Sequence, residues 1–143
     1  DNRIYLDNCS FNRPYDNQTI LRNYLEAEAK TYIQSQIINE NLELAWSYMM
    51  DYEIHFNPFE NRKNQIQKWK SVARVNIQYS ENNVLLAKEI RKQKIKIKDS
   101  IHIACAIEAG CRYFITTDDK LLNKIVDNIT IIDPITFIKH LEG

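Results

Sequence analysis

Residues 98–122, KDSIHIACAIEAGCRYFITTDDKLL, contain the clearest information on the fold. Apolar residues at helical spacing follow Asp99, which predicts a helix that ends at Gly110. The apolar run 113–116 predicts a short buried strand, and Asp118 comes directly after it. One helix and strand unit therefore has a carboxylate at its beginning and another at its end.

These two acids have a functional and a structural interpretation. In an open parallel sheet, strand ends and helix N-termini gather along one edge, where ligands bind. Asp99 and Asp118 would then be neighbours in space. Asp is also a favoured helix N-cap, so each residue can instead cap the helix that it precedes. Capping is the commoner role, and the case for chemistry has to come from the rest of the chain.

The composition is that of an ordinary globular protein. The 143 residues suit one domain, 1–143, with a sizeable core, and 44% apolar and 27% charged residues disfavour disorder. No apolar run reaches the ~18 residues of a membrane span, and the polar first twenty residues are unlike a signal peptide. Three cysteines without a CxxC pair argue against a disulfide framework and a thiolate zinc site. We expect a cytoplasmic protein without membrane contact.

The net charge is zero, but its distribution along the chain is uneven. Residues 1–60 contain four basic and ten acidic residues, 61–98 contain eleven and two, and 99–143 contain four and seven. The basic residues are densest in 88–98, directly before Asp99. Such a run can bind phosphates through counterion release, although runs of charge are usually solvated helix faces.

The rest of the chain alternates helices with short buried strands. We expect strands at about 3–6, 42–46, 113–116 and 129–132, and helices at about 18–39, 48–57, 60–71, 81–93, 99–109, 120–126 and 134–141. Residues 72–80 are expected to be a connection and 94–98 a short extended piece. On the first long helix the predicted buried stripe is Leu21, Leu25, Ala29, Tyr32, Ile33 and Ile37. This order predicts an α/β fold of three layers, α/β/α, with a short parallel central sheet.

Two more acids occupy positions comparable to those of Asp99 and Asp118. Asp7 follows the first strand, where an Asx turn is the structural alternative. Glu53 shares about one helical face with Met50, and a carboxylate that faces inward is costly unless it is paired or binds a cation. Mg²⁺ prefers oxygen ligands, and two such ions can activate a water and stabilise the leaving oxygen of a phosphodiester. The four carboxylates therefore predict a site for phosphodiester hydrolysis.

Several short motifs occur in a recognisable order along nearly the whole chain. They are YLDN at 5–8, Ser47 with Glu53 six residues later, the Ala-rich helix 99–110, TTD at 116–118, and IDP at 132–134 before Phe137. In this order the sequence resembles the PIN-domain nucleases, which are small α/β/α metal-dependent ribonucleases. That family includes the toxins of many bacterial toxin-antitoxin pairs.

The resemblance implies a ribonuclease that uses Mg²⁺ or Mn²⁺ and has an RNA substrate. It implies that the catalytic metal ligands are Asp7, Glu53, Asp99 and Asp118. Four polar residues near these acids are candidates for a supporting role: Asn8, Thr116, Thr117 and Asp119. The three uncharged ones also suit turns and caps without any function. Asp119 is in addition an alternative to Asp118 as the ligand. Our candidates for binding RNA phosphates are Arg13, Lys94, Lys96 and Lys98. In toxin members a small antitoxin protein blocks the site and the nuclease forms a homodimer.

Two other classes of function stay open at this stage. One is a PIN-like fold without catalysis that serves as an RNA-binding or protein-interaction module, against which the presence of all four acids speaks. The other is a receiver-like phosphoryl-transfer domain, which needs a Lys after the last strand where this chain has Pro134. Three residues near the motifs favour structural roles: His102 a hydrogen-bonded position, and Trp69 and Cys105 the core.

Overall fold

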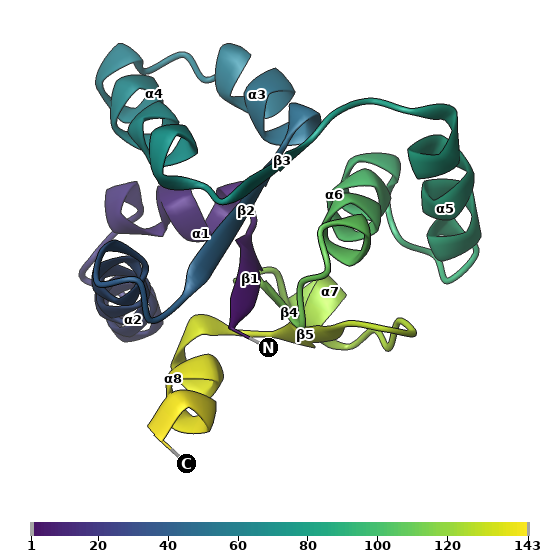
Figure 1. The fold of residues 1–143 in the computed structure, drawn as a ribbon. Coiled ribbons are helices and arrows are strands. Elements are labelled where there is room, and N and C mark those ends of the chain that lie inside the picture. The colour runs from purple at the N-terminus through teal and green to yellow at the C-terminus, as the bar shows by residue number, and fades with distance from the viewer. Residues whose placement is uncertain (1, 143) are drawn as a thin grey trace.

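The central sheet has five parallel strands in the part of the chain that the computed structural model describes, residues 2–142 (Figure 1). The strands are β1 (Arg3–Leu6), β2 (Glu43–Ser47), β3 (Val75–Ile77), β4 (Tyr113–Ile115) and β5 (Thr130–Ile132). Their order is β3-β2-β1-β4-β5, and each neighbouring pair is parallel. Helices lie on both sides of this sheet, which confirms the predicted three-layer fold.

The helices cover the two faces of the sheet in separate groups. In Figure 1, α5 and α6 pack together on one side, and α2 lies with α1 and α8 on the other. The helical elements are α1 (Asn8–Asn12), η1 (Arg13–Tyr15), α2 (Leu21–Ile38), α3 (Tyr48–His55), α4 (Glu60–Gln67), η2 (Lys68–Val72), α5 (Glu81–Arg91), α6 (Ile97–Glu108), α7 (Asp119–Leu122) and α8 (Pro134–Glu142). Within residues 2–142, no helix is both long enough and apolar enough to span a membrane.

The core forms where the middle strands meet α6. Strand β1 is flanked by β2 and β4, and three of its four residues are buried, as expected for a strand covered on both faces. On α6 the small residues Ala104, Cys105 and Ala106 are fully buried, so this helix can approach the sheet closely. Cys105 is therefore a core residue, as predicted, and Trp69 packs partly buried against the same core.

Two segments, one before and one after α5, differ from the sequence-based expectation. Strand β3 lies within 72–80, a segment that the sequence predicts to be a simple connection. It is an edge strand beside β2, and its three residues are too few for a reliable periodic pattern. Residues 92–94 form a turn in which Lys94 has φ 64°; Lys96 is extended, but α6 already begins at Ile97, so the predicted extended piece 94–98 is wrong for most of its length.

The buried face of α2 is also partly different from the predicted stripe. Ala29, Ile33 and Ile37 are buried, but Leu21, Leu25 and Tyr32 are 69%, 44% and 42% exposed. Polar residues take their place on the inward side, and one of them, Glu26, is ion-paired with Arg13 of η1 and with Arg22 of the same helix. The segment 9–17, expected to be a loop, contains the short helix α1 and the turn η1.

Candidate active site

Asp7 lies at the end of β1, in the middle of the carboxyl edge of the sheet. Asp7 is 4% exposed, and its backbone N–H donates to the carbonyl of Ile115 (3.2 Å) on the neighbouring strand β4. The carboxylate caps α1: Oδ1 accepts from the N–H of Ser10 (2.9 Å), and Oδ2 accepts from the Thr116 hydroxyl (2.5 Å). Burial raises the pKa of Asp7 to about 6, although these hydrogen bonds act in the opposite direction.

Asp118 is held to the same edge through Thr116. The Thr116 hydroxyl, which donates to Asp7, also accepts from the backbone N–H of Asp118 (3.1 Å). The Asp118 carboxylate caps α7, because Oδ1 accepts from the N–H of Lys120 (2.9 Å). Thr116 thus joins two of the four predicted ligands, and it does so because β1 and β4 are adjacent parallel strands. The capping interpretation of Asp118 is correct, and the residue also lines the cavity described below.

Glu53, on α3, is oriented by a buried hydrogen-bonded chain. Nδ1 of His102 bonds the Tyr5 hydroxyl (2.5 Å), which also bonds Oγ of Ser47 (2.6 Å), and Nε2 of His102 bonds Oε1 of Glu53. Because an ionised carboxylate can only accept, the bond to Glu53 requires a proton on Nε2. His102 is therefore a hydrogen-bonded structural residue, as predicted. Its connection to Tyr5 was not predicted; the available signal was a tyrosine hydroxyl inside an apolar strand, which needs a partner.

Asp99 is the third residue of α6 and faces the other acids. Lys96 occupies the N-cap position, so the capping interpretation is wrong for Asp99. Burial is the largest influence on the Asp99 carboxyl and raises its pKa. The charges of Asp118 and Glu53 also raise this pKa, whereas His102 and Lys96 lower it. The first turn of a helix favours a negative charge through the helix dipole. The position therefore suits a carboxylate that shares its surroundings with other acids.

The thiol of Cys9 lies in the electrostatic field of the four predicted acids. Burial raises the pKa of this thiol to about 12, and the charges of Asp7, Asp118, Asp99 and Glu53 raise it as well, in that order. The residue itself is exposed, because it lines an open hollow of about 340 Å³ beside Asp118. Cys9 was not among the predicted site residues.

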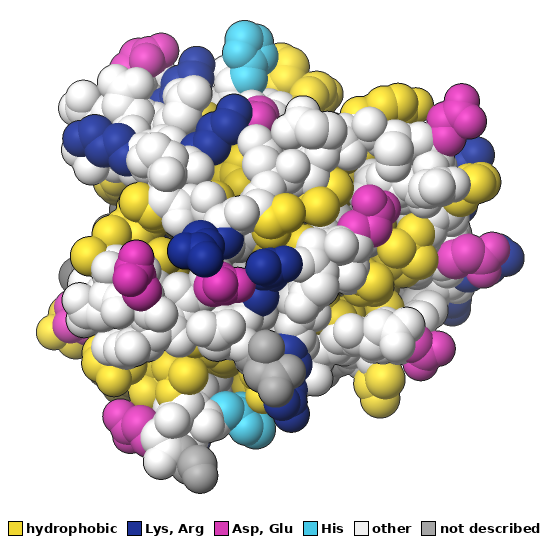
Figure 2. All heavy atoms as spheres, viewed as in Figure 1, with side chains coloured by type: hydrophobic (Ala, Val, Ile, Leu, Met, Phe, Trp, Pro, Cys, Tyr) yellow, Lys and Arg dark blue, Asp and Glu magenta, His cyan; other side chains and the backbone are white. Residues whose placement is uncertain are grey.

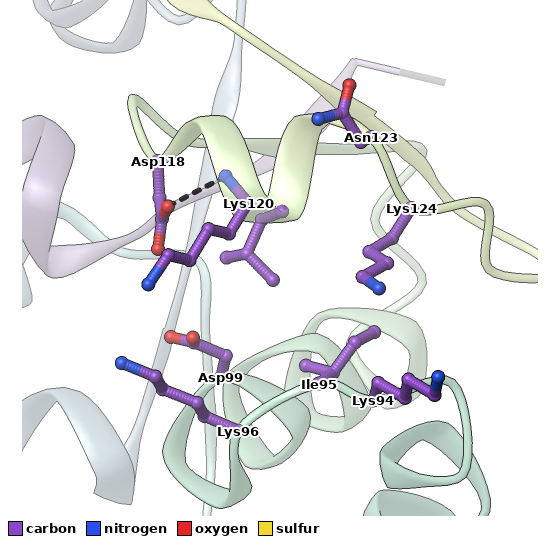
Figure 3. A pocket seen from close by; sticks show the side chains of 9 residues that line it. Lys94, Ile95, Lys96, Asp99, Asp118, Lys120, Asn123 and Lys124 are labelled. Atoms are coloured by element: carbon purple, nitrogen blue, oxygen red, sulfur yellow. Dashed lines mark hydrogen bonds between the residues drawn. The ribbon is translucent and has the colours of Figure 1, made fainter.

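A second cavity, of about 330 Å³, lies on the other side of Asp118 (Figure 3). Asp99 and Asp118 form part of its wall, and they come from α6 and from the start of α7. Its other lining residues are Lys94, Ile95, Lys96, Lys120, Leu121, Asn123 and Lys124. Acidic and basic side chains therefore meet at the carboxyl edge of the sheet, and two of the predicted phosphate-binding lysines are among them.

Asp119 and Arg13 have partners within the protein. Arg22 binds Asp119 with two nitrogens, at 2.8 Å and 2.7 Å, and this holds the pKa of that carboxyl below its usual value. Asp118, not Asp119, lines both cavities. Arg13 donates to Asp16 (2.9 Å), and its Nε lies 3.1 Å from Oε1 of Glu26, so its predicted contact with RNA would compete with these ion pairs.

The other predicted residues lie close to the acids. Oδ1 of Asn8 accepts from the amide of Asn12 (3.1 Å) at the hollow beside Cys9. Thr117 is buried and its carbonyl accepts from Arg22 (3.2 Å). Nζ of Lys98 lies 5.6 Å from the centre of the Tyr52 ring, next to Glu53 on α3.

The basic middle part of the sequence does not form one surface. Figure 2 shows Lys and Arg side chains gathered over α4, whereas Lys94 and Lys96 of the α5–α6 connection line the cavity beside Asp99. Several of the basic residues of this region have partners there: Lys63 pairs with Glu60, Lys70 pairs with Asp51, and Arg62 stacks over Phe59. The solvated-face interpretation therefore fits α4, and the phosphate-binding interpretation remains for the α5–α6 turn.

The donor set fits a hard divalent cation. Among residues 2–142, no three His, Cys, Asp or Glu side chains are grouped closely enough to form a metal site as they stand. The carboxylates nevertheless offer only oxygen, which Mg²⁺ and Mn²⁺ prefer, and such ions keep several waters. Burial raises the pKa of Asp7 and Asp99, and neighbouring acids raise that of Asp99 further. A cation bound between these groups would reverse that effect.

This small parallel α/β domain with acids along the carboxyl edge of its sheet matches the model of one protein family. The PIN domain model matches residues 4–126. The chain belongs to the PIN domain family, whose members are generally nucleases.

Comparison with solved structures agrees on the fold. The chain resembles one in the crystal structure of VapBC2 from Rickettsia felis bound to a DNA fragment from their promoter. The two are 16% identical with a TM-score of 0.55, over 90% of this chain and 96% of that one. No curated protein matches this sequence.

Proposed function

We propose that this chain is a metal-dependent endoribonuclease whose catalytic carboxylates are Asp7, Glu53, Asp99 and Asp118. The observation that carries the proposal is that the Thr116 hydroxyl joins Asp7 to Asp118, and that Asp118 and Asp99 line one cavity although they come from different elements. Membership of the PIN domain family supports the same reaction class. Mg²⁺ or Mn²⁺ held by these acids would supply a bound water acidic enough to attack a phosphodiester.

The residues of this chain divide the work of the site among them. Thr116 and Ser10 fix the Asp7 carboxylate, and His102 fixes that of Glu53, so neither has to be ordered when substrate binds. Asp99 and Asp118 face the cavity with the lysines. The RNA phosphates would contact the positively charged residues around this edge, which are Arg13, Lys94, Lys96 and Lys98.

We further propose a small antitoxin protein and a second copy of this chain as partners, and a cytoplasmic location. The similar solved structure is itself a VapBC2 complex. Exposed apolar residues at the start of α2, including Leu21, Tyr24 and Leu25, offer a surface that a partner would cover.

The test is cleavage of labelled total RNA by the purified protein, with Mg²⁺, with Mn²⁺ and with a chelator. Asp99→Asn should abolish metal-dependent cleavage, and Asp127→Asn, an exposed acid outside both cavities, should not change it. Binding of RNA without cleavage under any metal would overturn the catalytic proposal. That outcome would favour an inactive RNA-binding module.

A further inference from the structure

The cavity beside Asp99 has one end that contains both of its carboxylates, here called the acidic end, and a basic end whose charged residues are lysines only. Figure 3 shows Asp99 and Asp118 on one side, where Lys96 and Lys120 also point, and Lys94 and Lys124 on the other. The lysine Lys124 belongs to the segment after α7, and Lys94 to the turn after α5. Two separate parts of the chain thus bring ammonium groups to the same end of one cavity.

Among the described residues, 2–142, neither of these ammonium groups has an acidic partner. Within residues 2–142, the ion-paired lysines are Lys63, Lys70 and Lys92, and all three lie outside the cavity. At the basic end, the two lysines have no carboxylate paired with them and repel each other, and an anion bound between them removes that repulsion. The basic end therefore favours a negatively charged ligand.

The walls of the cavity indicate which part of a nucleic acid would enter. Ile95 and Leu121 are buried apolar residues of its wall, and the other lining residues are polar or charged; none is aromatic. Recognition of a base normally uses an aromatic face or a fixed set of amide groups. Unpaired lysines instead bind phosphate as point charges. The cavity is thus suited to the backbone of a nucleic acid and not to its bases.

The backbone at Lys94 is a second observation at the same end. Lys94 has φ 64°, in the left-handed region, where glycine is the usual residue after a helix. A lysine at this position is unfavourable for the fold alone. Its side chain nevertheless lines the cavity, which gives a reason for its presence.

We propose that Lys94 and Lys124 together bind the phosphodiester next to the one that is cleaved. The acidic end holds the phosphodiester to be cleaved, and the basic end fixes the register of the strand without reading its sequence. This inference rests on the proposed ribonuclease function, because it places the scissile phosphate at Asp99 and Asp118.

Binding can be tested separately from cleavage. Fluorescence anisotropy of a labelled oligouridine RNA, measured in a chelator over a range of salt concentrations, gives the affinity and its salt dependence. Lys94→Gln and Lys124→Gln should each weaken binding, and the double variant should lower the slope of log K against log salt by about 0.7, the value for one phosphate of a single strand. Because both lysines hold one phosphate, the two effects should be less than additive. The matched control is Lys139→Gln on α8, outside the cavity.

Lys94→Gly separates binding from folding. This variant should unfold at the same temperature as the wild type or at a higher one, and still bind RNA more weakly. Two outcomes would overturn the shared phosphate site. One is a slope of log K against log salt that is the same for the double variant and for the control. The other is a loss of binding free energy in the double variant that equals the sum of the losses in the single variants. If the lysine variants behave as expected but no metal supports cleavage, the nuclease proposal fails while the phosphate site stands.

Discussion

Nε2 of His102 is hydrogen-bonded to Oε1 of Glu53, and Nδ1 of the same ring is bonded to the Tyr5 hydroxyl. The ring is 2% exposed, so it connects the buried centre of β1 to an acid at the protein surface. Glu53 has no other hydrogen-bond donor among residues 2–142. Its direction therefore depends on His102.

We expect His102→Gln to slow metal-dependent RNA cleavage by about 10- to 100-fold, the range found when partners of metal ligands are removed. In a protein that already carries Glu53→Gln, adding His102→Gln should lower the rate little further, because His102 acts only through Glu53. Cleavage rates at saturating metal measure this cycle, and thermal unfolding checks that both variants fold. Additive losses would show that His102 acts independently of Glu53.

Thr116 gives a second test of positioning. Its hydroxyl donates to Asp7 and accepts from the N–H of Asp118, so Thr116→Val should leave a buried carboxylate with one donor fewer. We expect weaker binding of Mn²⁺, by about tenfold, in calorimetric titration. Thr116→Ser keeps the hydroxyl and should restore the affinity. A valine variant with unchanged affinity would contradict the role of this hydroxyl.

Neighbouring Asp118 and Asp119 should respond differently to the same change. Asp118 lines both cavities, whereas Arg22 binds Asp119 on the outside. Asp118→Asn should therefore slow cleavage by more than about 100-fold, the upper end of the range for residues that only hydrogen-bond to a metal ligand. Asp119→Asn should cleave nearly as fast as the wild type. The reverse order of effects would make Asp119 the ligand.

The sequence predicts the positions of the four acids well because they depend on local order. A strand end or a helix start can be recognised from apolar runs, Gly110 and Pro134, and parallel topology then brings those ends to one edge. Family resemblance adds the roles of the residues.

What the sequence misses depends on contacts between distant segments. Strand β3 forms because it pairs with the edge of β2, and the buried carboxylate of Glu26 on α2 has an ion-pair partner in Arg13 of η1. The bond between Tyr5 and His102 spans 97 residues. Helical phase or propensity contains no information about such partners, since each position looks ordinary within its own segment.

Lys30 provides a prediction about stability that is independent of the site. This residue is 9% exposed, and its Nζ lies 5.9 Å from the centre of the Phe11 ring. Burial lowers its pKa from 10.5 to about 8, so the unfolded chain binds the proton more tightly. Stability should therefore rise between pH 8 and pH 10.5, as the folded protein no longer buries a charge.

Lys30→Met should be more stable than the wild type at pH 7, by up to about 3 kcal/mol, and the difference should shrink above pH 8. Urea unfolding at several pH values measures it. Lys139→Met, on exposed Lys139, is the control and should show no such trend. An equal gain at every pH would mean that apolar packing, and not the buried charge, is responsible.

Asp7 has the opposite pH dependence, and this links stability to the proposed metal. Its pKa is raised from 3.8 to about 6, so the folded protein binds the proton more tightly than the unfolded chain. The stabilising effect of this protonation is complete below pH 3.8 and is lost as the pH rises to about 6. At pH 7.5 in a chelator, Asp7→Asn should therefore be more stable than the wild type, by about 1–3 kcal/mol. Below pH 4 the difference should disappear.

Added Mg²⁺ should stabilise the wild type by mass action and the variant much less. A variant that is less stable than the wild type at pH 7.5 without metal would contradict this prediction. It would mean that the hydrogen bonds of the Asp7 carboxylate stabilise the fold by more than the burial of its charge destabilises it.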